Sequence, residues 1–270
     1  MCTQSSPPLG DRDDGPSGVV SHTVDTWARV DDRWSVPAIT RHRTALVLVA
    51  RVLAVQPAVT FDLFGTLVEV TRPPDPARAV ADELRARDVP VPEDWATAYG
   101  EHHVDAPEGA EVPLPAHVAA ALRSRGIAPR TTGASGNAVR RAVVAAFDPE
   151  VSVRPGADRA VAAARERGPV GLLSNCSVPE LARRSLLRAG LGDAFDVTVT
   201  SAGCGWRKPH PAAFESVAER LAVPPETLVH VGDDPRTDGG VTEVGGRFVD
   251  LTATPLGELP AWFERSLGGR

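Results

Sequence analysis

The sequence is poor in several residue types. Its 270 residues include three cysteines, one methionine, one tyrosine and a single lysine, Lys208, among 29 basic residues. The cysteines, Cys2, Cys176 and Cys204, are odd in number and lack the spacing of a zinc site, so no disulfide framework or structural metal is expected. Such cysteine usage suits a reducing compartment, and we expect a cytoplasmic protein.

Long apolar runs and dense basic clusters are also missing. The best candidate for a membrane span, residues 45–55, is too short and is interrupted by Arg51. A net charge of −6 without a basic cluster argues against a nucleic-acid partner. We expect a monomer or homodimer that binds neither membrane nor nucleic acid.

Composition and pattern divide the chain into three parts. Residues 1–55 begin rich in Ser, Pro, Gly and Asp, and we expect a disordered or weakly ordered extension. Residues 71–153 form a predicted all-helical cap, inserted into an α/β core made of 56–70 and 154–270. The helices predicted within the cap are 76–87, 93–103, 115–125 and 136–147.

The core sequence alternates helices with short apolar strands. Strands are predicted at the start of the core, up to Asp62, and at 169–175, 195–201, 227–234 and 246–251. A capping box of Ser177 and Glu180 predicts the start of the helix between the second and third strands. Such alternation is typical of a parallel sheet covered on both faces, a Rossmann-like three-layer fold. Ligands of these sheets bind at the carboxyl ends of the strands.

Polar residues gather at these predicted strand ends. In chain order they are Asp62, Ser174, Asn175, the loop residue Lys208, and the acidic run Asp233, Asp234 and Asp238. Four stretches carry them: "FDLFGTL" (61–67), "LLSN" (172–175), "RKP" (207–209) and "VGDDPRTD" (231–238). Their order and placement resemble the four motifs of the haloacid dehalogenase-like hydrolase superfamily, in the subfamily with a helical cap inserted after the first motif.

The resemblance implies a hydrolase of a small anionic substrate. Asp62 would be the nucleophile of a covalent aspartyl intermediate. Ser174, placed by the pattern just before a helix N-terminus, and Asn175 would hold an anionic substrate oxygen. Lys208 would neutralise both the nucleophile and the substrate, a position where a compact ammonium suits better than a planar guanidinium. This explains why the only lysine of the chain stands in this motif.

The acidic run predicts a magnesium site, because clustered carboxylates repel each other unless a cation neutralises them, and Mg²⁺ takes oxygen ligands. By resemblance the ligands would be Asp62, Asp233 and the backbone carbonyl of Phe64, with Asp238 acting through a water molecule or by orienting its neighbours. Asp234 has two interpretations of similar weight, as a ligand or as a turn residue.

One position departs from the phosphatase pattern of this superfamily. Phe64 stands where phosphatases carry a second Asp, the general acid and base, and an aromatic residue there is typical of the dehalogenases. The "GDD" run, by contrast, is the magnesium-dependent, phosphatase-like version. We therefore favour a phosphatase acting on a small phosphorylated metabolite. Hydrolysis of a carbon–halogen bond and a non-catalytic binding protein are the alternatives.

Several other residues attract attention and are assigned structural roles. The adjacent pair His102 and His103 cannot share a helix face, and a nucleophilic cysteine at Cys176 would need a base that the sequence does not show. Ordinary structural roles are likewise expected for Arg72, Arg85, Trp206, Arg207 and His210.

Overall fold

The computed structural model describes residues 57–129 and 137–268. Our expectation for residues 1–55 lies outside the described residues and stays a prediction. Within the described ranges, no helix has the length and apolar character needed to cross a membrane.

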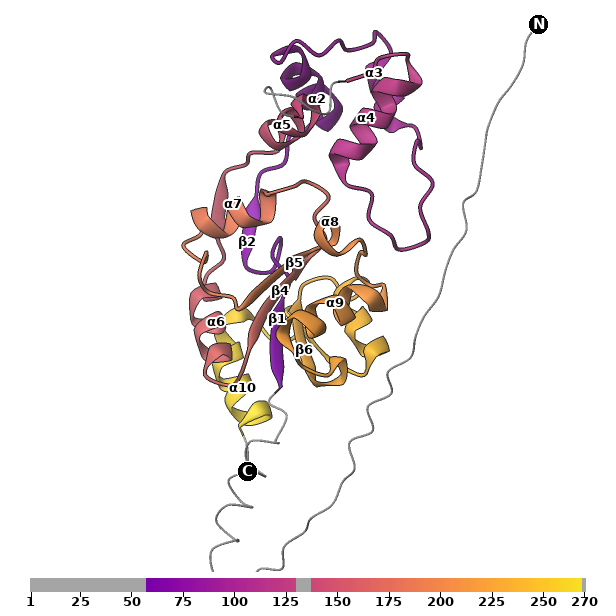
Figure 1. Cartoon of the computed structure of the whole chain (residues 1–270). Helices are drawn as coiled ribbons and strands as arrows, with labels where there is room; N and C mark the ends of the chain where they lie inside the picture. Colours follow the sequence, from indigo (N-terminus) through magenta and orange to yellow (C-terminus); the bar gives the residue numbers. More distant parts are fainter. Residues whose placement is uncertain (1–56, 130–136, 269–270) are drawn as a thin grey trace, which may run out of the picture. The chain divides into compact units, whose positions relative to one another are not determined.

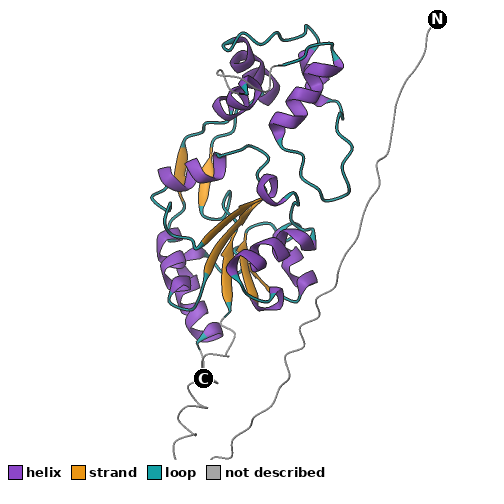
Figure 2. Ribbon diagram, in the orientation of Figure 1, coloured by secondary structure: helices purple, strands orange, loops and turns teal. Residues whose placement is uncertain are grey.

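Five parallel strands form the main sheet (Figure 2). The strands β4, β1 and β6 lie at its centre and are buried along their whole length, as expected for a sheet covered on both faces. Because β1 pairs with β4 on one side and with β6 on the other, the carboxyl ends of these three strands meet at one edge. In spatial order the strands are β5 (Val197–Thr200), β4 (Val170–Ser174), β1 (Ala58–Phe61), β6 (Leu228–Gly232) and β7 (Arg247–Asp250).

Helices cover both faces of this sheet (Figure 1). Val59 of β1 belongs to a hydrophobic cluster with α6 (Ala157–Arg165) and α10 (Leu259–Leu267). Its neighbour Ala58 packs on the opposite side, in a cluster with α9 (Pro211–Leu221). Since successive side chains of a strand point to opposite faces, these clusters are the two interfaces of a three-layer fold. The predicted α/β class is confirmed.

The α/β core also contains several short elements and the helix α10, which we did not predict from the sequence. In α10, Leu259 and Phe263 are fully buried and four residues apart, which places them on one helix face. The short elements are α7 (Leu181–Arg188), α8 (Ser201–Cys204) and the 3₁₀ helices η1 (Pro225–Thr227), η2 (Asp238–Val244) and η3 (Leu256–Glu258).

A second, antiparallel sheet joins β2 (Val68–Val70) to β3 (Val151–Val153). We call the chain between these two strands the helical insert. Strand β3 was not predicted, because its partner is distant in sequence and its three residues carry little pattern of their own. The helices of the insert are α2 (Pro76–Arg85), α3 (Trp95–Gly100), α4 (Leu114–Ser124) and α5 (Ala138–Ala146).

The helical insert has a hydrophobic core of its own, to which its helices contribute side chains. Three of its four helices match the predicted ranges closely, whereas α3 ends early because the backbone becomes extended at Glu101. Cys176 and Val178, which follow β4, also pack into this core. The insert therefore contacts the segment that leaves β4, next to the central strand β1.

The predicted capping box of Ser177 and Glu180 is wrong. Helix α7 begins only at Leu181, and the preceding Glu180 has a left-handed backbone with φ of 67° and makes no capping hydrogen bond with its side chain. Pro179 disfavours helical geometry in the residue before it, so the helix starts late. As a result Ser174 does not lie at a helix N-terminus, contrary to our expectation.

Candidate active site

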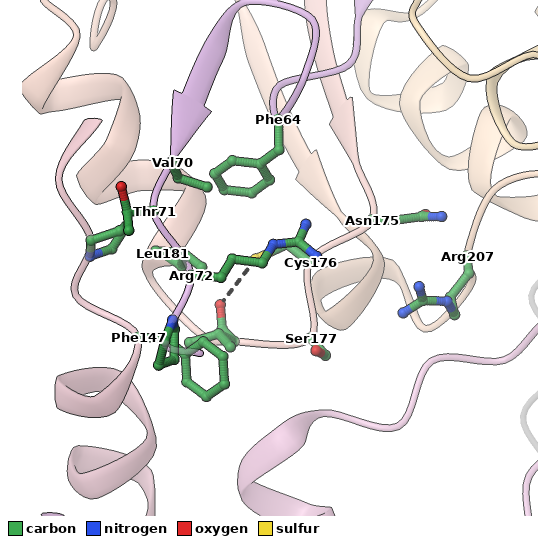
Figure 3. Close-up of a pocket in the computed structure, with 13 residues that line it drawn as sticks. Phe64, Val70, Thr71, Arg72, Phe147, Asn175, Cys176, Ser177, Leu181 and Arg207 are labelled. Carbon is green, nitrogen blue, oxygen red and sulfur yellow. Dashed lines mark hydrogen bonds between the residues drawn. The ribbon is translucent and has the colours of Figure 1, made fainter. Parts of the chain in front are cut away.

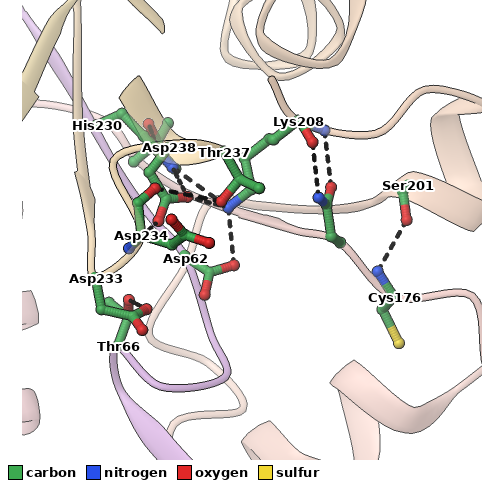
Figure 4. A network of polar contacts seen from close by, with 12 residues as sticks. Asp62, Thr66, Cys176, Ser201, Lys208, His230, Asp233, Asp234, Thr237 and Asp238 are labelled. Atoms are coloured by element: carbon green, nitrogen blue, oxygen red, sulfur yellow. Dashed lines mark hydrogen bonds and ion pairs between the residues drawn. The ribbon is translucent and has the colours of Figure 1, made fainter. Parts of the chain in front are cut away.

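Three predicted site residues meet at the carboxyl edge of the sheet, and Figure 4 shows two of them, Asp62 and Asp233. Asp62 directly follows β1, Ser174 is the last residue of β4, and Asp233 directly follows β6. Because β1 is hydrogen-bonded to both other strands, the topology itself brings these residues together. This is the edge at which parallel sheets bind their ligands.

Lys208 lies buried between two carboxylates of this edge. Its Nζ donates hydrogen bonds to Asp62 Oδ1 at 2.8 Å and to Asp238 Oδ1 at 2.6 Å. Burial alone would lower the pKa of Lys208, but the charges of the two carboxylates outweigh it and raise that pKa above its ordinary value. The ammonium is therefore charged and held against Asp62.

Asp238 is a buried partner of Lys208 whose own oxygens are engaged by the protein. Oδ1 lies 3.1 Å from His230 Nε2, and Oδ2 accepts a hydrogen bond from the backbone N–H of Asp234 at 3.1 Å. Although burial opposes ionisation, the hydrogen bond from His230 and the charge of Lys208 hold the pKa of Asp238 well below its usual range. These surroundings are those of a residue that positions Lys208.

Asp62 differs from Asp238 in its environment. Burial raises the pKa of Asp62 above its ordinary value, and the charge of Lys208 opposes this shift only in part. One of its oxygens is fixed by Lys208, and the side chain keeps a small exposed area, whereas that of Asp238 is nearly sealed. Of the two carboxylates, Asp62 is the one that a substrate can reach.

Asn175 holds the backbone of Lys208. Its Nδ2 donates to the carbonyl of Lys208 at 2.9 Å, and its Oδ1 accepts from the N–H of Lys208 at 2.8 Å. Both polar atoms of the amide are used in this pair of hydrogen bonds. The structure thus places Asn175 as a support for Lys208 at the rim of the site.

The hydroxyl group of Ser174 is buried without a hydrogen-bond partner in the described part of the chain. Buried polar atoms are normally satisfied, so an unpaired one at a ligand-binding edge indicates a partner supplied by a ligand. From the sequence we expected a helix N-terminus to hold an anionic oxygen beside Ser174. In the structure the reason to expect an anionic oxygen there is the buried hydroxyl of Ser174 itself.

Asp233 lies against the loop that follows Asp62. Thr66 Oγ1 donates to its Oδ1 at 2.7 Å, and a β-carbon at Gly65 would lie only 2.6 Å from its Oδ2. Gly65 also has φ of +89°, so both its backbone and its lack of a side chain permit this approach. Asp62 and Asp233 follow the adjacent strands β1 and β6, and each keeps one carboxylate oxygen that accepts no hydrogen bond from the described residues, so we call them an open pair of carboxylates.

This pair fits part of a magnesium site. No described group of three or more His, Cys, Asp or Glu side chains is arranged to hold a metal ion. Two carboxylates and a backbone carbonyl are nevertheless an adequate set for Mg²⁺, which keeps several of its waters. Asp234 does not join the pair, because its carboxylate accepts three hydrogen bonds from Arg236, which hold its pKa below the usual range.

A pocket of about 200 Å³ adjoins the site and is lined by Phe64 and Asn175 (Figure 3). Arg72 and Arg207 also line it, together with Cys176. Burial raises the pKa of the Cys176 thiol, so this cysteine is neutral, in line with our view that it is no nucleophile. The remaining lining residues are Val70, Thr71, Pro73, Phe147, Pro149, Ser177, Val178 and Leu181.

Other residues set aside in the sequence have structural partners. Arg85 pairs with Asp82 on the surface of α2, and His103 lies 2.6 Å from the carbonyl of Ala98. His210 is the N-cap of α9 and stacks on Trp206, as expected for a helix-start role.

Three polar residues at the site were missed. His230 Nε2 lies 3.5 Å from Nζ of Lys208, and Thr66 donates a hydrogen bond to Asp233. Ser201 accepts a hydrogen bond from the N–H of Cys176 at 2.8 Å. Only His230 left a signal, since it is the one ionisable residue inside the apolar stretch "LVHVG" of β6. Thr66 and Ser201 become meaningful only through partners that are distant in sequence.

Comparison with known proteins agrees with the geometry. A family model described as haloacid dehalogenase-like hydrolase matches residues 57–239. Phosphoserine phosphatase of Thermus thermophilus is 39% identical over 85 residues, which are 31% of this chain and 34% of that protein. A phosphatase of Mycobacterium tuberculosis is 43% identical over 70 residues, 26% of this chain and 32% of that one. The matches thus span about a third of the length of these curated relatives.

Among solved structures, 2-haloacid dehalogenase from Pseudomonas syringae pv. Tomato has a TM-score of 0.52 with 21% sequence identity. The match covers 78% of this chain and 99% of that one. At this level of identity the likeness shows a shared fold and says nothing further about activity.

Proposed function

Because the chain belongs to the haloacid dehalogenase-like hydrolase family, we propose that it is a magnesium-dependent phosphatase acting on a small phosphorylated metabolite. The observation that carries the proposal is the buried hydroxyl of Ser174, which has no partner within residues 57–129 and 137–268 and lies at the same sheet edge as Asp62, Asp233 and Lys208. A hydroxyl donor, an ammonium and an open carboxylate pair are what a phosphoryl group and its counter-ion require. The two partly matching curated relatives are named as phosphatases.

The proposed reaction uses Asp62 as the nucleophile. A carboxylate oxygen of Asp62 attacks phosphorus, the bond to the leaving oxygen breaks, and the leaving group takes up a proton from water. A water molecule then hydrolyses the acyl phosphate, which releases inorganic phosphate and restores the carboxylate. Lys208 orients Asp62 throughout and offsets the negative charge that the phosphoryl group brings.

Asp62, Asp233 and the backbone carbonyl of Phe64 are the proposed magnesium ligands. When bound, Mg²⁺ would neutralise phosphate charge and make the phosphorus a better electrophile. We assign Asp238 a positioning role instead, because Lys208, His230 and a backbone N–H already occupy its oxygens.

Phe64 limits the leaving groups that the proposed phosphatase can expel. Its ring lines the pocket and cannot give or take a proton, and the loss of one acid–base group typically lowers a rate about 10²–10⁴-fold. That loss matters least when the leaving oxygen is a weak base. We therefore propose that the natural leaving group is weakly basic, as in an acyl phosphate, an enol phosphate or a phosphoanhydride.

Arg72 adds a second feature of the proposed substrate. Figure 3 shows its side chain inside the pocket, near Phe64 and Cys176, and none of the ion pairs among described residues involves it. A cation that lines a small pocket without a carboxylate partner suits an anionic group of the ligand. We propose that the leaving group carries a second negative charge, such as a carboxylate, and binds in this pocket.

The test is hydrolysis of para-nitrophenyl phosphate with Mg²⁺ and with a chelator, for the wild type and Asp62→Asn. We expect turnover only in the wild type with Mg²⁺. Asp193→Asn is the matched control, since it removes an exposed carboxylate before the amino end of β5, opposite the carboxyl edge that holds the site, and should retain activity. A series of aryl phosphates should show kcat/KM rising steeply as the leaving group becomes less basic.

A second candidate is hydrolysis of a carbon–halogen bond, which the aromatic Phe64 favours because a halide leaves without a proton. Release of chloride or bromide from a 2-haloacid in the presence of chelator, without phosphate ester turnover, would establish it. A chain that releases neither phosphate nor halide would be the non-catalytic binding protein.

A further inference from the structure

We propose that Glu111, which belongs to the helical insert, is a positioning residue that orders the two loops holding Lys208. The inference rests on the proposed function, because only that function gives Lys208 its role. The helical insert would then help to position Lys208 beside Asp62, in addition to lining the pocket.

The loop before α4 lies alongside the segment that leads to Lys208. Ala110 and Trp206 form an isolated antiparallel bridge. The N–H of Arg207 donates to the carbonyl of Gly109 at 2.9 Å, and the N–H of Glu111 donates to the carbonyl of Gly205 at 2.8 Å. The insert thus pairs through its backbone with the segment immediately before the lysine.

The approach depends on a glycine. Gly109 has φ of +77°, and a β-carbon at this position would lie 2.7 Å from Cδ2 of His210. His210 is held in turn by stacking on Trp206. A larger residue at 109 would therefore be strained in its backbone and would push the loop away from the segment.

The side chain of Glu111 adds hydrogen bonds to Ser201 and Arg207 to this backbone pairing, and we call this arrangement the clamp. Its side chain is 3% exposed, and Oε2 accepts hydrogen bonds from Ser201 Oγ and from Arg207 Nη1, the latter at 2.6 Å. A carboxylate this deeply buried is tolerated only when its partners compensate for lost hydration. Both partners are therefore required: Ser201 begins α8, and Arg207 lies in the segment that follows α8.

The two partners of Glu111 lead directly to the lysine. Ser201 Oγ accepts the N–H of Cys176, the residue after Asn175, whose amide holds the backbone of Lys208. Arg207 precedes Lys208 in the chain. One carboxylate therefore fixes Lys208 from both sides, through the loop after β4 and through its own loop.

The test compares Glu111→Gln with Glu108→Gln, which makes the same charge change at an exposed position of the same loop. Amide hydrogen exchange should become at least about tenfold faster at Cys176, Arg207 and Lys208 in Glu111→Gln, because the hydrogen bonds of these amides depend on the clamp. It should not change in Glu108→Gln. With para-nitrophenyl phosphate, kcat should fall on the order of 10²-fold and KM should change little, as expected for a displaced charge.

The exchange measurement keeps this proposal separate from the proposed function. If the wild type hydrolyses no phosphate ester, the proposed function fails, while exchange at the three amides still decides the role of Glu111. If Glu111→Gln does not fold, Gly109→Ala serves instead, since it separates the same loops and leaves the carboxylate in place. Wild-type exchange at all three amides, or a wild-type kcat in an active Glu111→Gln enzyme, would overturn the proposal.

Discussion

Lys208 in the core and Arg125 in the helical insert each join two carboxylates, and the two arrangements can be compared. In the core, Lys208 joins Asp62 to Asp238, and its side chain is 1% exposed. In the helical insert, Arg125 joins Asp94 to Glu101, and the two carboxylates are 52% and 42% exposed. The chemistry of the pairing is the same, whereas the surroundings differ.

The comparison teaches what burial adds to an ion pair. In the insert, water screens the charges, and the hydrogen bonds of Arg125 lower the pKa of Glu101 without fixing it strongly. In the core, burial of Lys208 weakens the screening by water, so Lys208 can hold a carboxylate in one geometry. The exposed triad contributes modestly to stability, and the buried one is suited to chemistry.

Exchanging the two cations should break the comparison most clearly. We expect Lys208→Arg to lower kcat/KM on the order of 10²-fold, nearly as much as Lys208→Ala, because a guanidinium needs more room and displaces Asp62. The reverse exchange, Arg125→Lys, should leave kcat/KM unchanged. Activity of Lys208→Arg close to that of the wild type would show that the site needs only a positive charge.

Removing one carboxylate from each triad should lower the free energy of unfolding by different amounts. Asp238→Asn leaves Lys208 buried with one partner fewer, and we expect unfolding to become easier by about 3–5 kcal/mol. Glu101→Gln, its counterpart on the surface, should change stability only slightly. Urea unfolding of both variants provides the measurement, and equal midpoints would contradict the contrast drawn here.

Arg72 extends the comparison to a third cation. Lys208 and Arg125 pair with carboxylates of the protein, whereas the proposed partner of Arg72 is an anionic group of the substrate. With a substrate that carries a second anionic group, Arg72→Gln should raise KM about tenfold or more, since a hydrogen bond to a charged group is worth about 1.5–3 kcal/mol. With para-nitrophenyl phosphate the variant should behave like the wild type. A similar KM increase for both substrates would place Arg72 outside the leaving-group pocket.

The smallest expected effect is a pH dependence in the insert. The hydrogen bond from Arg125 lowers the pKa of Glu101 in the folded protein below its ordinary value of 4.5. This contribution to stability is therefore present above pH 4.5 and is lost as pH falls through the folded pKa. Arg125→Gln should be slightly less stable than the wild type at pH 7, and thermal melts of the two should converge at lower pH.

The sequence was sufficient to predict the carboxyl edge of the sheet. Asp62, Ser174 and Asp233 each follow or end an apolar strand, and parallel strands bring such ends together whatever the details of packing. Lys208 was predicted from its motif and from its isolation among arginines. The roles of these residues stay predictions, as do the magnesium ion, the domain boundaries, the oligomeric state and the cytoplasmic location.

Other features depended on contacts that no local pattern contains. The capping box at Ser177 failed because Pro179 and the left-handed Glu180 delay the helix. Glu111 lies far from Ser201 in sequence, so its burial could not be foreseen. His230 could have been found, because a histidine in a buried strand must have a polar partner, and here Asp238 and Thr60 supply it.

The small sheet of β2 and β3 has a consequence for how such a protein can change. Val70 and Val151, the residues at which the chain leaves and re-enters this ribbon, are direct register partners. A segment whose two ends are neighbours can be lengthened, shortened or exchanged without altering the strands outside it. Grafting a different insert between these two valines should therefore leave the five-stranded sheet folded. Evolution can alter the substrate preference of the scaffold in the same way, provided that the new insert again supplies a partner for Ser201 and Arg207.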